Sequence, residues 1–285
     1  MTTAGRYVSA QEAIQHIQSG QRVFIHGSAQ TPLHLLEELG NQKDRLNNVE
    51  LVFITVQGDI TVARPEFEGH FNLNCFFVSD PVRRAVAEGR ADFIPAFLSD
   101  IPDLFKQGIM PLDVAIVQVC PPDKFGYCSL GASVDIARSA VNTARKVIAL
   151  VNPKVPRTHG DTMIHMDRFE SMVYHEADLP EVDYGSKIGE EEMMIARHIA
   201  GVIEDGSTLQ VGIGTIPDAV LKCLSNHKNL GVHTEMFSDG LIPLFESDVI
   251  NNSQKKIYPN KTVTGFAIGT RRLYDYIDDN PVFNF

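Results

Sequence analysis

The stretch LQVGIGTIPDAV, from Leu209 to Val220, combines residue types that can bind a negatively charged group. Its glycine-rich turn, with a β-like run before it and a helix-like run after it, consists of Gly212, Ile213, Gly214, Thr215 and Ile216. Glycines permit a tight turn and a close approach to a ligand, and the free N–H groups of a first helical turn favour negative charge. The motif alone fits a phosphate or oxyanion site, and it fits a plain tight turn equally well.

An acidic residue, Glu235, follows Gly214 by about 21 residues, which is close to the spacing in a nicotinamide-dinucleotide site. In such a site the third small residue of the pattern is glycine or alanine, whereas Pro217 stands at that position here. The residues around Glu235, in GVHTEMFSDG, are mostly polar, which is typical of a strand end that faces a cleft. The sequence therefore disfavours a dinucleotide site.

The glycine turn and Glu235 are both expected at the carboxyl ends of neighbouring parallel strands, where open α/β sheets bind their ligands. A carboxylate beside main-chain N–H donors is suited to acyl transfer. The carboxylate attacks a carbonyl group, and the donors stabilise the negative charge that develops on its oxygen. A solvated or ion-paired acid at a strand end remains the alternative interpretation of Glu235.

The composition excludes several classes of protein. A chain of 285 residues with a net charge of −11 lacks the basic face that nucleic acids require, although clustered N–H groups can still bind a small anion. The four cysteines form no CxxC pair, so no zinc site and no disulfide framework is indicated. No signal peptide and no membrane-spanning run is visible, which predicts a cytoplasmic protein with no membrane partner.

Short apolar segments alternate with helix-like segments, which predicts parallel strands with helices on both sides of the sheet. The expected helix at residues 9–20 begins with a capping box formed by Ser9 and Glu12. The other expected helices include residues 33–40, 81–89 and 101–108. The expected strands include residues 21–27, 49–56, 75–79, 112–120 and 144–151.

Three blocks of sequence recur in the same order, which indicates an internal repeat. Residues 13–39 match 199–224, residues 47–59 match 228–240, and residues 77–95 match 267–285. We therefore expect an α/β protein with two related open parallel-sheet domains, at residues 1–186 and 187–285. The first copy continues for about 90 residues beyond its last block, so we expect the second domain to be incomplete.

The two motifs around Gly212 and Glu235 resemble those of the acetyl-CoA hydrolase/transferase family of class I CoA transferases. The N-terminal half is also similar to that family, in HGSAQTP (26–32), GYCSLGASVD (126–135) and VNPKVPRTHGDTMIHMDRFE (151–170). The resemblance covers essentially the whole chain and implies two related CoA-transferase-like domains with an active site between them. Members of the family are longer and carry a further glycine-rich loop that this sequence does not contain.

The resemblance implies that Glu235 is the catalytic glutamate and that residues 212–216 bind the CoA thioester, with main-chain N–H groups on the oxyanion. Acyl-CoA and a small carboxylic acid would be the substrates, coenzyme A would be a substrate and not a bound cofactor, and the protein would be a homodimer or larger. If water replaces the acceptor acid, the same site becomes an acetyl-CoA hydrolase. A nicotinamide-dependent dehydrogenase and an inactive or ligand-binding fragment are the alternatives from other classes.

Several other polar residues are expected to be structural. The positions His159, Asp161 and His165 match no established zinc spacing, and no metal is expected. No nucleophile elbow surrounds the serines of residues 129–135, so a serine hydrolase is disfavoured. The pairs Arg83–Arg84 and Arg271–Arg272 are expected on solvated helix faces. Residues Ser28, Gln30 and Thr31 are expected either to face the acyl group or to form a plain turn.

Overall fold

The computed structural model describes residues 7–183 and 188–285, so the domain boundary expected near residue 186 lies outside the described residues. The chain divides into two compact units. The first is Met1–Val155 with Thr162–Pro180, and the second is Pro156–Asp161 with Glu181–Phe285. The short segment Pro156–Asp161 therefore belongs to the second unit, although in sequence it interrupts the first.

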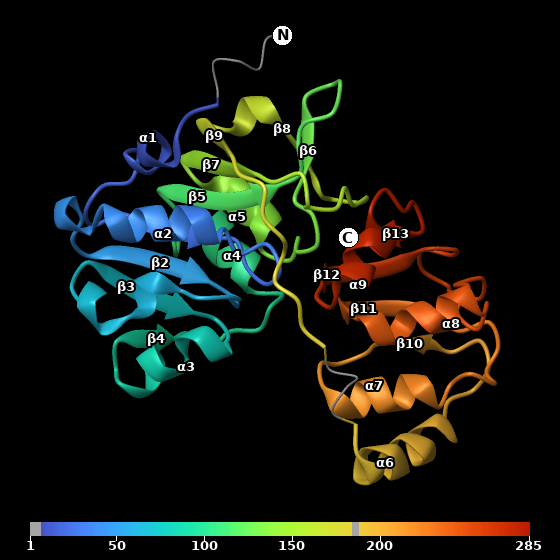
Figure 1. Ribbon diagram of the computed structural model, residues 1–285. Helices are drawn as coiled ribbons and strands as arrows, with labels where there is room; N and C mark the ends of the chain where they lie inside the picture. Colours follow the sequence, from blue (N-terminus) through green and yellow to red (C-terminus); the bar gives the residue numbers. More distant parts are fainter. Residues whose placement is uncertain (1–6, 184–187) are drawn as a thin grey trace. The chain divides into compact units, whose positions relative to one another are not determined.

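The first unit is built on a seven-stranded parallel sheet with the strand order β4-β3-β2-β1-β5-β7-β9 (Figure 1). Its strands are β1 (Arg22–Ile25), β2 (Val49–Phe53), β3 (Phe71–Cys75), β4 (Ala91–Phe93), β5 (Val114–Val119), β7 (Lys146–Val151) and β9 (Ser171–Tyr174). Every residue of the central strand β5 is buried, as expected for a parallel strand covered on both faces. A separate antiparallel pair is formed by β6 (Tyr127–Ser129) and β8 (Met163–His165).

Helices cover both faces of this sheet, with α2 in front of it and α4 and α5 behind it in the view of Figure 1. The helices are α1 (Ala10–Ile14), α2 (Leu33–Asn41), α3 (Asp80–Ala87), α4 (Ile101–Lys106) and α5 (Ala137–Thr143). The predicted capping box is confirmed, because the Glu12 N–H donates to Ser9 Oγ (3.2 Å) and the Ser9 N–H donates to the Glu12 carboxylate (3.0 Å). Leu35, Leu36 and Leu39 of α2 are fully buried in the core.

The second unit has a four-stranded parallel sheet with the order β10-β11-β12-β13. Its elements are α6 (Glu190–Ala200), β10 (Thr208–Leu209), α7 (Thr215–Lys222), β11 (Gly231–Phe237), α8 (Ile242–Glu246), β12 (Thr262–Ala267), α9 (Arg271–Ile277) and β13 (Phe283–Asn284). This order repeats β1-β2-β3-β4, which confirms the predicted parallel-sheet α/β fold and its repetition. On its other side β1 pairs with β5, whereas β10 has no such partner among the described residues.

The Pro156–Asp161 segment joins the second unit by backbone pairing beyond β13. The Phe285 N–H donates to the His159 carbonyl (2.9 Å), and the Asp161 N–H donates to the Phe285 carbonyl (2.9 Å). Gly160 lies between them with φ +106°, and a Cβ built there would be 2.4 Å from the Phe285 carbonyl oxygen. Only glycine fits this approach, since a side chain would collide with backbone that cannot move away.

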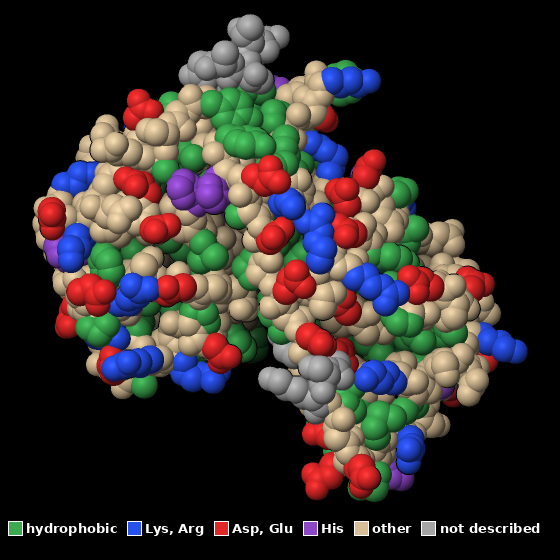
Figure 2. All heavy atoms as spheres, in the orientation of Figure 1, with side chains coloured by type: hydrophobic (Ala, Val, Ile, Leu, Met, Phe, Trp, Pro, Cys, Tyr) green, Lys and Arg blue, Asp and Glu red, His purple; other side chains and the backbone are tan. Residues whose placement is uncertain are grey.

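Most predicted elements are present, but three features differ. The helix expected at residues 9–20 is much shorter, because α1 ends at Ile14. Residues 75–79 were expected to form a strand, whereas β3 ends at Cys75 and the hydrogen-bonded segment is the more polar FNLNC that precedes it. The β6–β8 pair was not predicted, because each of its strands has only three residues and shows no alternating pattern. None of the helices in residues 7–183 and 188–285 is long and apolar enough to cross a membrane. On the face drawn in Figure 2, acidic and basic side chains are interspersed.

Candidate active site

Glu235 lies on β11 with its side chain exposed. Burial alternates along this strand: His233 and Glu235 are exposed, and Thr234 and Met236 are buried. Because successive side chains point to opposite faces of a strand, Glu235 faces away from the core. Within the part of the chain that the structure describes, nothing donates a hydrogen bond to the Glu235 carboxylate or forms an ion pair with it. The carboxylate is therefore accessible to a ligand.

The polar residues around Glu235 do not all face a cleft, as the sequence had suggested. Thr234 and Ser238 are 5% and 3% exposed, and both belong to the buried face of the strand. Ser238 Oγ donates to the buried Asp218 carboxylate of α7 at 3.3 Å. The polarity of this stretch therefore has two causes, since one face carries the accessible acid and the other carries hydrogen bonds to neighbouring elements.

The glycine turn connects β10 to α7, and its two glycines differ in what requires them. Gly214 is the N-cap residue of α7 with φ +123°, a conformation that strongly favours glycine. Gly212 has no such φ, and a Cβ built on it would meet only Pro217 Cγ, at 3.7 Å. The backbone conformation therefore favours glycine at position 214, whereas neither conformation nor packing requires it at position 212.

The turn presents open main-chain groups. Gly212 and Ile213 are exposed, and Thr215 and Ile216 are the first two residues of α7. The first N–H groups of a helix have no acceptor within the helix and lie at the positive end of its dipole. Pro217, the third residue, has no N–H to contribute. This arrangement is suited to a negatively charged oxygen, and the binding role of the turn stays a prediction.

The strand register relates the turn to the acid. β10 pairs with β11 in parallel, with Thr208 beside Gly231 and Leu209 beside Val232. The backbone pairing ends at Leu209, and continuing its register by three residues would align Val211 with Thr234 and Gly212 with Glu235. The contact between Val211 and Thr234 is present, because Thr234 Oγ1 accepts from the Val211 N–H (2.9 Å) and donates to the Val211 carbonyl (3.0 Å).

On its other side Glu235 is fixed by β12. Thr264 lies beside Thr234 in the register, and its Oγ1 contacts the carbonyl oxygens of Glu235 (3.1 Å) and Phe266 (3.0 Å). Thr264 is only 2% exposed, so this contact lies within the sheet and not at its surface. The backbone of Glu235 is thus held from both neighbouring strands while its carboxylate is free.

Two pockets lie near these residues. One, of about 210 Å³, is lined by uncharged residues of α6, α7 and the glycine turn: Ile199, Ile203, Leu209, Gln210, Val211, Gly212, Ile216, Pro217, Val220, Leu221 and Leu224. The other, of about 160 Å³, includes Asp183, Asp218, Lys222 and Asp239 in its lining. Burial raises the pKa of Asp218. Three carboxyl groups against one lysine make this second pocket unsuited to the phosphates of coenzyme A.

Comparison with known proteins identifies the family. The acetyl-CoA hydrolase/transferase N-terminal domain matches residues 4–184. The chain belongs to the acetyl-CoA hydrolase/transferase family. The 4-hydroxybutyrate coenzyme A transferase of Clostridium kluyveri is 42% identical over 97% of this chain and 64% of that protein. The succinyl-CoA:acetate/propanoyl-CoA:succinate CoA transferase of Fasciola hepatica is 44% identical over 95% of this chain and 57% of that protein.

Solved structures agree with this assignment. The 4-hydroxybutyrate CoA-transferase of Porphyromonas gingivalis has a TM-score of 0.87 at 34% identity, covering 99% of this chain and 67% of that chain. Acetyl-CoA hydrolases are also similar, at lower identities of 25–26%. The chain spans 64% and 57% of the lengths of the two curated transferases named above.

The N-terminal motifs that resemble the acetyl-CoA hydrolase/transferase family form a buried polar network in the first unit. His26 is fully buried, its Nε2 is 2.7 Å from the Ser133 carbonyl, and its Nδ1 accepts from the Gln118 N–H (3.1 Å). These contacts define a neutral imidazole with its proton on Nε2, and burial lowers the pKa of His26 to about 4. Gln118 Nε2 donates to Gln30 Oε1 (3.4 Å), and Gln30 Nε2 has no hydrogen-bond partner among the residues that the structure describes.

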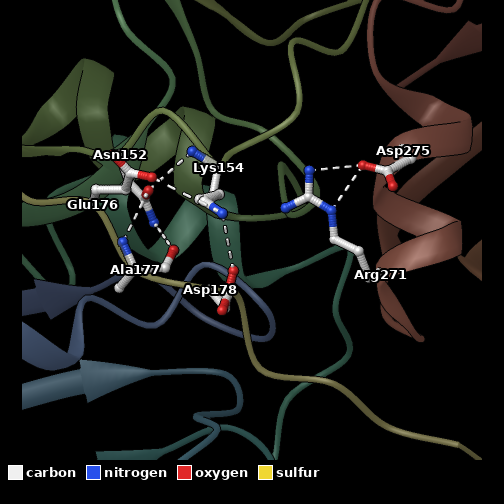
Figure 3. Close-up of polar contacts among 7 residues, drawn as sticks. All are labelled: Asn152, Lys154, Glu176, Ala177, Asp178, Arg271 and Asp275. Atoms are coloured by element: carbon white, nitrogen blue, oxygen red, sulfur yellow. Dashed lines mark hydrogen bonds and ion pairs between the residues drawn. The ribbon is translucent and has the colours of Figure 1, made fainter.

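Asn152 links the VNPK motif to the chain that leaves β9 (Figure 3). Its Nδ2 donates to the Ala177 carbonyl (2.8 Å), and its Oδ1 accepts from the Lys154 N–H (3.0 Å). Lys154 also forms ion pairs with Glu176 (3.9 Å) and Asp178 (3.4 Å). This motif therefore holds residues 176–178 in place.

The remaining candidates have other partners. His159 Nε2 contacts Asp279 (3.0 Å), whereas His165 Nδ1 contacts Asp167 (3.3 Å), and the described residues contain no cluster that could hold a metal ion. Ser133 contacts His26 through its carbonyl, and its hydroxyl donates to Asp135 (2.8 Å), so His26 does not activate the Ser133 hydroxyl.

The two arginine pairs are exposed and bonded to acids, as predicted: Arg83 to Asp80, Arg84 to Glu88, Arg271 to Asp275 and Arg272 to Glu246. The Arg271–Asp275 pair within α9 is drawn in Figure 3. Ser28, Gln30 and Thr31 are buried, which favours the turn interpretation of these residues.

Proposed function

We propose that the protein is an acyl-CoA:carboxylate CoA-transferase in which Glu235 is the nucleophile and the Gly212–Ile216 turn binds the thioester. The observation that carries the proposal is the exposed, unpaired Glu235 carboxylate on the strand next to the strand that ends in this turn. The names of the relatives at 42–44% identity, all CoA transferases, point to the same reaction.

The reaction proceeds by exchange at the Glu235 carboxyl group. Its oxygen attacks the carbonyl carbon of acyl-CoA, the C–S bond breaks, and the products are CoA thiolate and an acyl-glutamyl anhydride. The thiolate then attacks the glutamyl carbonyl carbon, which releases the first carboxylate and leaves CoA bound to Glu235 as a thioester. An acceptor carboxylate reverses both steps and leaves with CoA. Covalent catalysis divides one difficult exchange into easier ones, and ping-pong kinetics follow.

The glycine turn supplies the electrostatic part of this mechanism. Each addition places negative charge on a carbonyl oxygen, and N–H donors already directed at that position stabilise it without reorganisation. Gly212 lies beside Glu235 in the continued register and carries no side chain where packing would permit one. We infer that this glycine leaves room for the thioester between the turn and the carboxylate.

Water in place of the acceptor acid would make the same site a hydrolase. The transferase is favoured because the relatives of higher identity are transferases, whereas acetyl-CoA hydrolases match at 25–26%. Coenzyme A would enter and leave as a substrate, and none of the proposed steps uses a metal ion. The homodimer, the cytoplasmic location and the domain division at residues 1–186 and 187–285 stay predictions.

Chemical trapping of the intermediate tests the proposal. The purified protein is incubated with acyl-CoA alone, treated with borohydride or hydroxylamine, digested and examined by mass spectrometry. We expect modification only in the peptide that contains Glu235, and none in the Glu235→Ala variant. Glu246→Gln is the matched control, since Glu246 is an exposed acid of the same unit that pairs with Arg272. Modification of another residue, or an adduct that persists in Glu235→Ala, would refute the assignment.

A further inference from the structure

The backbone hydrogen bonds between β10 and β11 end before the glycine turn. At that point the side chain of Thr234 takes the place of a backbone partner. β10 ends at Leu209, so its backbone pairing with β11 does not extend to Val211. At the next inward-facing position of β11, the Thr234 hydroxyl takes over both functions of a backbone partner: it accepts from the Val211 N–H and donates to the Val211 carbonyl. A hydroxyl can do both because it has one proton to donate and two lone pairs.

We propose that Thr234 is a positioning residue that holds the main-chain N–H groups of the Gly212–Ile216 turn at a fixed distance from the Glu235 carboxylate. Thr234 is covalently next to Glu235 and is bonded to the residue directly before Gly212. It therefore fixes the turn to the strand that carries the nucleophile. The inference rests on the proposed function, because it assigns to this contact an effect on the reaction of Glu235.

Burial and neighbours make this contact well defined. The Thr234 side chain is 5% exposed, so water does not compete freely for its hydrogen bonds. Thr264, beside it on β12, bonds the Glu235 carbonyl from the opposite side. The two threonines thus form one buried polar row that joins the turn, β11 and β12 on the face opposite to the carboxylate.

The test compares Thr234→Val, which keeps the shape but removes the hydroxyl, with Thr234→Ser, which keeps the hydroxyl. Thr262→Val is the matched control: Thr262 is a fully buried threonine at the start of β12, two residues before Thr264, whose hydroxyl accepts from Asn252 Nδ2 (3.0 Å). Amide hydrogen exchange in peptides covering residues 210–217 measures the turn. Adduct formation at Glu235, followed against acyl-CoA concentration, measures its chemical consequence.

We expect Thr234→Val to raise the exchange rate of the Val211 amide at least tenfold, because its N–H loses its acceptor. The maximal rate of adduct formation should fall about 10- to 100-fold, whereas the half-saturating acyl-CoA concentration should change by no more than about threefold. The reason is that the turn acts mainly on the negative charge that develops in the transition state. Thr234→Ser should restore both quantities to within about threefold of the wild type. Thr262→Val should leave both within the same limit, whatever stability it loses.

Two results would overturn the inference. Unchanged exchange at Val211 in Thr234→Val would show that the hydroxyl does not hold the turn. Faster exchange of the Val211 amide together with an unchanged rate of adduct formation would show that the position of the turn does not affect the reaction of Glu235. Failure of the proposed function is recognised separately, because the wild-type protein would then form no adduct at Glu235 while the exchange measurement still decides whether Thr234 holds the turn.

Discussion

Substitution of His26 should change how the stability of the first unit depends on pH. The imidazole is fully buried, donates through Nε2 to the Ser133 carbonyl and accepts at Nδ1 from the Gln118 N–H. Burial lowers its pKa from 6.5 to about 4, because a charged imidazole would lose its hydration. Above pH 6.5 the residue is neutral in both folded and unfolded chains, and it contributes no pH dependence.

As the pH falls below 6.5, the unfolded chain binds a proton at His26 while the folded chain does not until the pH nears 4. Unfolding is therefore favoured progressively, and the stability lost between these two pH values is about 3.4 kcal/mol at 1.36 kcal/mol for each unit of pKa difference. At pH 5.0 the loss from this residue alone is about 2 kcal/mol. His26→Gln, which keeps a donor but cannot be protonated, should lack this part of the loss.

The assay is urea unfolding of the first unit at pH 7.5 and pH 5.0, followed by amide exchange in peptides of β1 and β5. Tryptophan fluorescence cannot be used, because the chain contains no tryptophan. At pH 7.5 the variant should be less stable by about 1–3 kcal/mol, since the Gln118 N–H loses its acceptor. Between the two pH values the wild type should lose about 2 kcal/mol more than His26→Gln. His16→Gln removes a partly exposed histidine and is the control.

Equal losses in wild type and His26→Gln would refute the argument, because a neutral buried imidazole must contribute the difference. An NMR titration gives an independent answer. The ring signal that is missing from the variant should titrate near pH 4 in the wild-type protein, and a midpoint near 6.5 would mean that His26 is hydrated.

Three further predictions concern the second unit. Asp218→Asn should stabilise the protein at pH 7 and not at pH 3. The pKa of the buried Asp218 is raised, which means that folding disfavours its charged form. The midpoints of urea unfolding at both pH values check this. Asp239→Asn should cost about 1 kcal/mol in thermal stability, since the Asp239 carboxylate accepts from both the N–H (2.7 Å) and the hydroxyl (2.6 Å) of the α9 N-cap Thr270. Gly214→Ala should lower the free energy of unfolding by about 1–2 kcal/mol, because alanine is strained at a φ of +123°. Gly212→Ala should leave the melting temperature nearly unchanged but slow adduct formation at Glu235. Equal effects of the two substitutions on the melting temperature would contradict these roles.

The sequence was sufficient for most of the strands, the repeat and the exposed acid, because those depend on patterns within short stretches. The run VAIVQV is apolar except for Gln118, and such a run is typical of a covered parallel strand. The sequence was insufficient for Thr234, whose role depends on a residue 23 positions away that becomes its neighbour only in the folded sheet. Its one local signal was its place directly before Glu235 on the alternate, buried face of a strand. The pairing of residues 159–161 with Phe285 is equally non-local.

The corresponding turns in the two copies of the repeat differ in structure. Ser28 in the turn of the first copy and Gly214 in the turn of the second both have positive φ, at +53° and +123°. In the first copy the turn is closed by its own side chains: Ser28 and Thr31 are buried, and Thr31 Oγ1 donates to the Ser28 carbonyl (2.8 Å).

In the second copy the matching turn has glycines at positions 212 and 214, is exposed around Gly212 and Ile213, and leaves its main-chain groups open. The strands that follow the two turns also differ. The second copy has the exposed carboxylate of Glu235, whereas the matching residue of the first copy is Ile54. Open N–H donors and an accessible carboxylate thus occur together in one copy and are both missing from the other. This joint difference supports the proposal that the reaction takes place in the second copy.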